Sequence, residues 1–183
     1  MRLWERCYCR HRFVGGNNVA AQDNYEDLTE CALTPELEKQ LVNSLGECVF
    51  MWVNSKNEPF GVVMSYLPKD GKLWLTAAET RKRIPALRRN PRAAICINST
   101  GSKMGGGKTV TYKGNCFIHD DRATKDWFYP EFANRLRPDS PAAADAFRKF
   151  LDSPHRVIME FIPDYALSFD ATLMWARSPE AVQ

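Results

Sequence analysis

The sequence has no apolar run close to the roughly 18 residues that a membrane-spanning helix needs. Its 183 residues also carry only a small net charge of +3, which neither requires nor excludes a polyanionic partner. The basic start at residues 1–13, MRLWERCYCRHRF, is not followed by an apolar segment, so it does not match a secretory signal. No internal repeat and no low-complexity tract is present. These absences favour one globular domain without a membrane anchor.

Cysteine is present, but not in the arrangement of a disulfide scaffold. A chain of this length with 44% hydrophobic residues builds a core without such bridges, and we expect a reducing, cytoplasmic setting. Cys7, Cys9 and His11 form C-x-C-x-H, which is not the spacing of a zinc knuckle, so no metal site is expected. Three other cysteines fall in strand-like segments, where we expect small buried side chains: Cys48, Cys96 and Cys116.

The glycine-rich stretch STGSKMGGGKT, at residues 99–109, is similar to a phosphate-binding P-loop. The pattern G-x-x-x-x-G-K-[ST] requires a glycine where this chain has Ser102, and a P-loop must be followed by a helix. Residues 109–118 instead alternate apolar and polar side chains, with Val110 and Tyr112 on one face, as a strand does. We therefore predict a loop between two antiparallel strands and no nucleotide hydrolase.

The remaining pattern predicts many short strands and few helices. Thr34 and Pro35 are typical of a helix start, Gly46 ends that helix, and the pair Asp70-Gly71 between apolar runs predicts a hairpin. Strands joined mostly by hairpins exclude a parallel βαβ sheet and favour a small antiparallel barrel. Strands are expected at 47–54, 60–67, 72–77, 93–98, 109–118, 155–163 and 165–173, and helices at 34–45, within 80–90, at 121–136 and at 140–152.

The densest charge in the sequence lies within residues 81–92. Thr80, Arg81 and Lys82 follow directly on a predicted strand, so a hydroxyl, a guanidinium and an ammonium meet at a strand-to-helix junction that suits a phosphate group. The alternative is a solvated helix face. The cations of this basic cluster are Arg81, Lys82, Arg83, Arg88, Arg89 and Arg92.

The order GKLWLTAAETRKRIPALRRNPRAAICIN, then a loop, then KTVTYKGNCFIHDD resembles the pyridoxamine 5′-phosphate oxidase-like family of FMN-binding split-barrel proteins. The resemblance covers roughly residues 35–170. It implies a mainly β fold with a six- to seven-stranded antiparallel split β-barrel, a homodimer, and FMN at the dimer interface. We expect an irregular arm at 1–32, a flavin-binding domain at 33–175 and a tail at 176–183.

The resemblance also implies which residues bind the cofactor: two positions that face it, a phosphate-binding junction, and a polar pair beside the flavin ring. In chain order these are Leu75 and Thr76, then Thr80, Arg81 and Lys82, then Lys108 and Thr109. The cofactor would carry the redox step, so no catalytic acid or base is named. His119 and His155 are lone histidines at strand ends, which we interpret as structural or exposed.

The implied function is a flavin-dependent oxidoreductase that passes hydride to or from a small organic substrate. The segment 60–67, FGVVMSYL, lacks the arginine and lysine of true pyridoxamine phosphate oxidases, with Ser65 at the lysine position, and the C-terminal arginine and histidine motif is missing.

The resemblance is equally good, in RRNPRAAI, to a branch that uses the deazaflavin coenzyme F-420, and the acidic tail of this coenzyme suits the basic cluster. A non-catalytic flavin- or haem-binding module is the other alternative. No nucleic-acid partner is expected, because the strands do not interleave aromatic and basic side chains.

Overall fold

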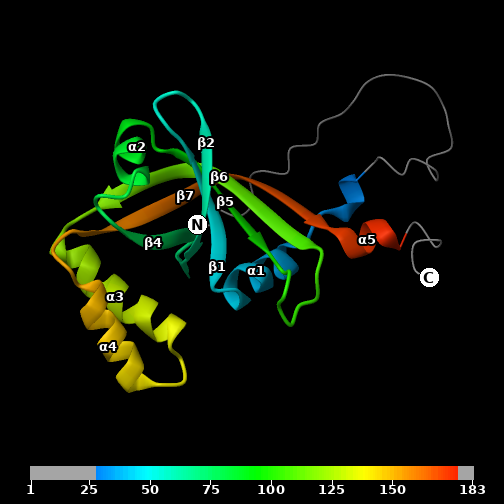
Figure 1. The fold of residues 1–183 in the computed structure, drawn as a ribbon. Helices are drawn as coiled ribbons and strands as arrows, with labels where there is room; N and C mark the ends of the chain where they lie inside the picture. Colours follow the sequence, from blue (N-terminus) through cyan, green and yellow to red (C-terminus); the bar gives the residue numbers. More distant parts are fainter. Residues whose placement is uncertain (1–27, 177–183) are drawn as a thin grey trace.

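The computed structural model describes residues 28–176 of the chain. The expectations for the arm and the tail, including those for Cys7, Cys9 and His11, fall largely outside these residues. The strands form one antiparallel seven-stranded sheet in the order β2-β1-β5-β6-β7-β4-β3, and the sheet curls into a split barrel (Figure 1). The predicted mainly β architecture is therefore confirmed.

Most elements lie within a few residues of the predicted ranges. There are two exceptions. Residues 67–69, expected as the end of one strand and the start of a turn, form a short strand of their own, and the two strands expected at 155–163 and 165–173 form a single long strand that a short helix follows. The strands are β1 (Glu47–Val53), β2 (Pro59–Ser65), β3 (Leu67–Lys69), β4 (Lys72–Ala78), β5 (Arg92–Asn98), β6 (Lys108–His119) and β7 (Arg156–Asp170). The helices are η2 (Thr29–Cys31), α1 (Pro35–Ser44), α2 (Arg83–Arg89), α3 (Arg122–Leu136), α4 (Pro141–Leu151) and α5 (Ala171–Trp175).

The barrel interior is filled by alternate side chains of the strands. In β1, Cys48, Phe50 and Trp52 are buried, whereas Val49 and Met51 between them are partly exposed on the outer face. This alternation is the period of two that a half-buried strand imposes. Burial of such a face drives the sheet to curl, because a flat sheet would leave the inner side chains in water.

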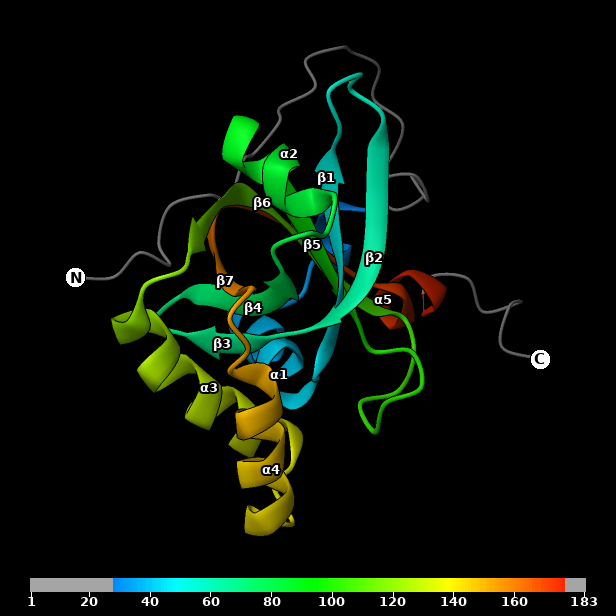
Figure 2. The ribbon, with the colours of Figure 1, turned by 60° about the vertical axis from the view of Figure 1, so that its left-hand side comes forward.

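Two helices close the ends of the barrel (Figure 2). The predicted start of α1 is confirmed, since the Thr34 side chain accepts a hydrogen bond from the backbone N–H of Leu37 at 3.2 Å. Leu41 of α1 is fully buried in the core at one end, and Ile84 of α2 is fully buried at the other. The short basic helix therefore has an apolar side that fixes it on the barrel.

Helices α3 and α4 form a hairpin that covers the outer face of β3, β4 and β7 (Figures 1 and 2). Phe128 and Phe132 of α3 pack with Trp74 of β4 and Ile158 of β7 in a second hydrophobic cluster. The outer face of β1, β2 and β5 has no such cover within the described part of the chain. The barrel thus has one covered and one uncovered outer side.

The glycine-rich loop is a strand connection, as predicted. Strand β6 follows it directly and pairs antiparallel with β5. Gly101, Gly105 and Gly107 have φ values of 76°, 74° and 87°, a region that glycine enters without steric cost. With no helix after the loop, no helix N-terminus is directed at a phosphate, so the P-loop interpretation is excluded.

A close contact between backbones fixes the bend of the long β6–β7 pair. The register shifts between Lys113 and Gly114, where Asp164 is an extra residue in β7. A Cβ on Gly114 would lie 2.1 Å from the carbonyl oxygen of Ile162, far inside van der Waals contact. Only glycine fits at this position.

We expect Gly114→Ala to lower the free energy of unfolding by at least about 2 kcal/mol, because the added methyl group forces the two backbones apart. Urea unfolding of both proteins measures the change. Gly106→Ala is the control, since its Cβ would meet nothing within 4 Å; this change should stay within about 0.5 kcal/mol. An equally small effect at Gly114 would contradict the assigned close approach.

Candidate functional site

The predicted phosphate-binding residues lie in the turn between β4 and α2. Thr80, Arg81 and Lys82 are all exposed there. The backbone N–H of Arg81 donates to the carbonyl of Ala78 at 3.0 Å, and that of Ile84 donates to Arg81 at 2.8 Å. The turn is therefore held by its own hydrogen bonds while its polar side chains project outward.

The positive charge at this turn is only partly neutralised. Arg88 pairs with Glu79 at 2.9 Å, and Arg92 forms an ion pair with Asp164. Arg81 and Lys82 have no acidic partner among the described residues. An excess of unpaired cations at one exposed turn is the electrostatic requirement for holding a phosphate.

Arg83 adds a second observation of the same kind. Its Nε atom is buried and has no hydrogen-bond partner among the described residues. Desolvation, followed by repulsion from Arg81, lowers the pKa of Arg83. Such a group is stabilised by an incoming anion, so the residues of this turn fit a cofactor phosphate.

The two expected residues of β4 face opposite sides of the sheet. Leu75 is fully buried in the barrel interior, so it offers only its backbone to a ligand. The Thr76 hydroxyl donates to the carbonyl of Val157 at 2.9 Å, on the face that α3 covers. Both residues lie in β4, which ends at Ala78 and leads directly into the basic turn, so both are near that turn.

The polar pair that opens β6 lies elsewhere. The Lys108 Nζ atom is 4.0 Å from an Asp170 carboxylate oxygen, and the backbone N–H of Lys108 donates to the Ser99 hydroxyl at 3.1 Å. Thr109 pairs with Asn98 of β5 and with Phe169 of β7. This pair sits at the rim formed by the glycine-rich loop.

The basic turn and the polar pair are separated by the length of β6. Thr76 is opposite Ile158 in β7, and Ile158 is opposite His119, the last residue of β6. Lys108 is the first residue of the same strand. At about 3.3 Å per residue the two ends of β6 are roughly 35 Å apart, so one protomer does not bring all the predicted residues to one ligand.

Between these groups the uncovered outer face of the sheet is largely apolar. Val63 is 66% exposed and Leu167 is 62% exposed. One row of cross-strand partners runs over this face from β2 to β7: Val63, Val49, Cys96, Thr111 and Leu167. A contiguous apolar row on a strand face is typical of a surface that another protein covers.

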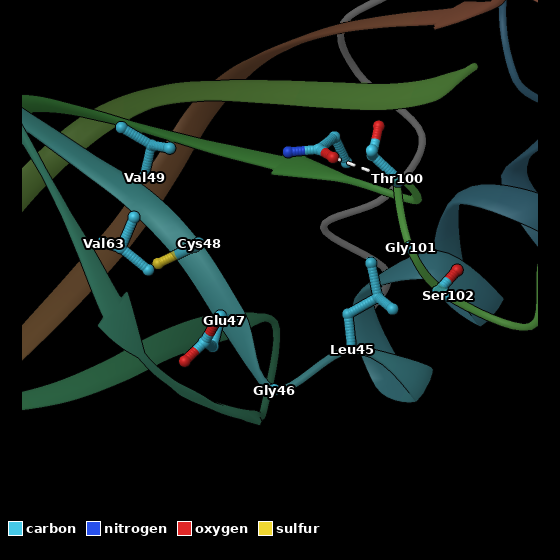
Figure 3. A pocket seen from close by; sticks show the side chains of 10 residues that line it. Leu45, Gly46, Glu47, Cys48, Val49, Val63, Thr100, Gly101 and Ser102 are labelled. Atoms are coloured by element: carbon cyan, nitrogen blue, oxygen red, sulfur yellow. Dashed lines mark hydrogen bonds between the residues drawn. The ribbon is translucent and has the colours of Figure 1, made fainter. Parts of the chain in front are cut away.

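A hollow of about 330 Å³ opens at the end of this face (Figure 3). Glu47 and Val63 line it from the β1–β2 side, and Thr100 and Ser102 line it from the glycine-rich loop. Asn98 links the hollow to the polar pair, because it is the cross-strand partner of Thr109. The sequence alone does not indicate these residues, since only the register of the strands shows that they share one end of one face.

Comparison with known proteins decides the family. The family model described as pyridoxamine 5′-phosphate oxidase matches residues 37–167, which is more than half of the chain. The chain belongs to this family. The matched segment contains the basic turn, the polar pair and the hollow, so all the candidate site residues lie within the family's shared domain.

Solved structures of family-like proteins show the same fold. A conserved hypothetical protein of Mycobacterium tuberculosis is 18% identical, with a TM-score of 0.66 over 76% of this chain and 87% of that chain. An F-420 reductase is 17% identical, with a TM-score of 0.54 over 70% of this chain and 94% of that chain. An FAD-binding protein of Mesorhizobium loti is 17% identical, with a TM-score of 0.53 over 75% and 92%. At these identities the likeness concerns the fold alone. No curated protein matches the chain.

His119 belongs to a polar network beside the covered face. Its Nε2 atom is 2.8 Å from a Glu160 carboxylate oxygen, and the other oxygen of Glu160 accepts from Lys72 at 2.6 Å. The Trp74 ring lies 5.9 Å from the imidazole, centroid to centroid.

Among residues 28–176, no group of three or more His, Cys, Asp or Glu side chains is arranged to hold a metal ion. None of the helices in this range has the length and apolar character of a membrane span. His155 is exposed.

This network makes the stability of the barrel depend on pH. Desolvation raises the pKa of Glu160, but the hydrogen bonds from Lys72 and His119 outweigh it, and the net shift is downward. A carboxyl group with a lowered folded-state pKa stabilises the fold above its unfolded-state pKa. This contribution is lost as the pH falls through the folded-state value.

We expect Glu160→Gln to be less stable than the parent at pH 7 by about 1–3 kcal/mol, because Lys72 loses a charged partner in a half-buried place. The difference should shrink steadily below pH 4.5, the ordinary pKa of this side chain. Thermal or urea unfolding between pH 3 and 8 measures it. A difference that is the same at every pH would show that the charge of Glu160 does not matter.

Proposed function

We propose that this member of the pyridoxamine 5′-phosphate oxidase family is a homodimeric, FMN-dependent oxidoreductase that acts on a small organic molecule. The observation that carries the proposal is the basic turn after β4. Thr80, Arg81 and Lys82 are exposed there with no acidic partner in the range 28–176, and the Nε atom of Arg83 is buried with no hydrogen-bond partner in the same range. A turn of this charge is suited to the phosphate of a mononucleotide.

Dimerisation would complete the site. Because β6 separates the basic turn from Lys108 and Thr109, one protomer would contribute the turn and its partner the polar pair. The apolar row from Val63 to Leu167 gives the second copy a surface to cover. A self-complementary interface of this kind has two equivalent cofactor sites, one at each end.

The protein would hold and orient the cofactor, while a bound flavin would supply the hydride chemistry through its ring. The basic turn would anchor the phosphate, and β4 would present the backbone of Leu75 toward the cofactor. The polar pair would meet the ring edge from the other protomer. Burial of the apolar row between two copies would exclude water from the ring. The cytoplasmic setting expected from the sequence remains part of this proposal.

The deazaflavin coenzyme F-420 is the second candidate. Arg89, exposed on α2, extends the positive charge beyond the turn, and an F-420 reductase shares the fold. A long acidic tail would make use of this extension, whereas FMN would not. A non-catalytic module that stores flavin or haem is the third candidate; it would bind its cofactor without turnover.

Cofactor titration tests the proposal. Purified protein should bind FMN, seen as a shift of the visible flavin bands and quenching of flavin fluorescence. In the variant Arg81→Ala with Lys82→Ala the affinity should fall at least about 100-fold, because two charge-assisted contacts to the phosphate are lost. Parallel titrations with coenzyme F-420 and with haem distinguish the three cofactors by their spectra.

Arg89→Ala is the control, since it removes a cation of the basic cluster that lies at the end of α2, outside the turn. This variant should leave the affinity for FMN nearly unchanged and should lower only the affinity for coenzyme F-420. Loss of FMN binding in this control, or none in the double variant, would remove the turn from the phosphate site. If no cofactor binds to the parent protein, the proposed function is wrong.

The dimer has a separate test. Leu167→Asp should convert the protein to monomers and abolish FMN binding, because it places a charge on the exposed β7 end of the apolar row that the second copy would cover. Light scattering after size exclusion measures the mass of both proteins. Leu173→Asp is the control, since this side chain is 45% exposed on α5, away from the row. A dimeric Leu167→Asp protein would place the interface elsewhere.

A further inference from the structure

The hollow forms because β1 and β5 separate at their shared end. Their pairing ends at Val49 and Cys96, and the next outward-facing residues are Glu47 and Asn98. Continuing the same register would bring these two residues opposite each other. The diverging strands instead leave the space of about 330 Å³ between them.

Glu47 gives the hollow its charge. Among the described residues that line the space, Glu47 is the only one with a formal charge. It is exposed at the strand-side rim and has no cationic partner in the described part of the chain. A carboxylate without a partner at the edge of a concave space attracts a positively charged ligand.

The strand side and the loop side of the hollow are complementary to a small organic molecule that has an apolar part and a polar acceptor atom. Val49 and Val63 line the strand side of the hollow with apolar side chains, farther from the Gly46 end than Glu47 (Figure 3). On the loop side, the Asn98 Oδ1 atom accepts from the backbone N–H of Thr100 at 3.1 Å, which leaves the amide NH₂ group free to donate. The Ser102 hydroxyl accepts from Met104 at 3.2 Å and keeps its proton for a ligand. The loop side therefore offers donors to an acceptor atom on the ligand.

The one thiol in the hollow does not act as a nucleophile. The Cys48 sulfur donates to the carbonyl of Met64 at 3.4 Å. Burial, with smaller effects from Cys96 and Glu47, raises the pKa of Cys48 to about 12, so the thiol stays protonated at neutral pH. The hollow is thus equipped to bind a ligand without reacting with it.

We propose that this hollow is the substrate end of the cofactor site and that it binds a small organic cation, a protonated amine with a short apolar body. The ammonium group would contact Glu47, the body would lie on Val49 and Val63, and an acceptor atom would face Asn98. The assignment to substrate rests on the proposed function, because Asn98 pairs with Thr109, the residue expected beside the cofactor ring. The binding chemistry itself rests only on the lining of the hollow.

A matched pair of probes tests the charge preference. 2-Phenylethylamine and 3-phenylpropionate have similar apolar bodies and opposite charges at pH 7. Calorimetric titration of the full chain should show binding of the amine at least about tenfold tighter than that of the acid. Glu47→Gln should abolish this preference, whereas Asn98→Asp, which keeps the acceptor for Thr100 and adds a second carboxylate, should strengthen amine binding severalfold.

Glu36→Gln is the control, since Glu36 is another exposed glutamate, in the first turn of α1 and outside the hollow. It should leave amine binding unchanged. Equal binding of the two probes, no binding of either at millimolar concentration, or an unchanged amine affinity in Glu47→Gln would each overturn the proposal.

The same titrations in the presence and absence of FMN separate this inference from the proposed function. If the protein binds the amine selectively but binds no flavin, the cation site stands and the proposed redox function is wrong. If the protein binds flavin but Glu47→Gln does not change its affinity for the amine, the proposed function stands and the cation site is wrong.

Discussion

The paired strands β6 and β7 are the constraint on which the rest of the molecule depends. They pair from Lys108 opposite Asp170 to His119 opposite Ile158, and the close approach at Gly114 fixes the bend between these ends. The ladder holds the glycine-rich loop at one end and the start of the α3–α4 hairpin at the other. A spacer of this length keeps the basic turn and the polar pair of one protomer apart, which is why the proposed cofactor site takes them from two copies.

The two outer sides of the barrel differ in how they are covered and in which side chains they expose. The α3–α4 hairpin buries the outer side of β4 and β7 with aromatic side chains, and the polar network of Glu160 lies at the edge of that layer. The other side keeps an apolar row in the open and ends in the hollow beside Glu47. The covered side therefore adds a second hydrophobic cluster to the barrel core, whereas the uncovered side is the one available to the partner and ligand that we propose.

Unpaired charge marks the two ends of the proposed site. Arg88 and Arg92 are neutralised by acidic partners, whereas Arg81 and Lys82 have none among the described residues. Glu47, at the other end of the uncovered face, has no cationic partner within residues 28–176 either. Charges of opposite sign, each without a partner, favour a cofactor with an anionic end and a substrate with a cationic one, and they orient the two relative to each other.

The sequence by itself determined the local structure and the family. Alternation along β1 and β6, the cap at Thr34, the turn at Asp70-Gly71 and the order of motifs from 71 to 121 depend on near neighbours, so each could be predicted without the fold. Strand register and curvature depend on distant contacts. For that reason only the tertiary structure decided that β7 is continuous through its bulge, and that Thr76 of β4 lies level with the end of β6 that is remote from Lys108. It also decided that Glu47 and Asn98 line one hollow.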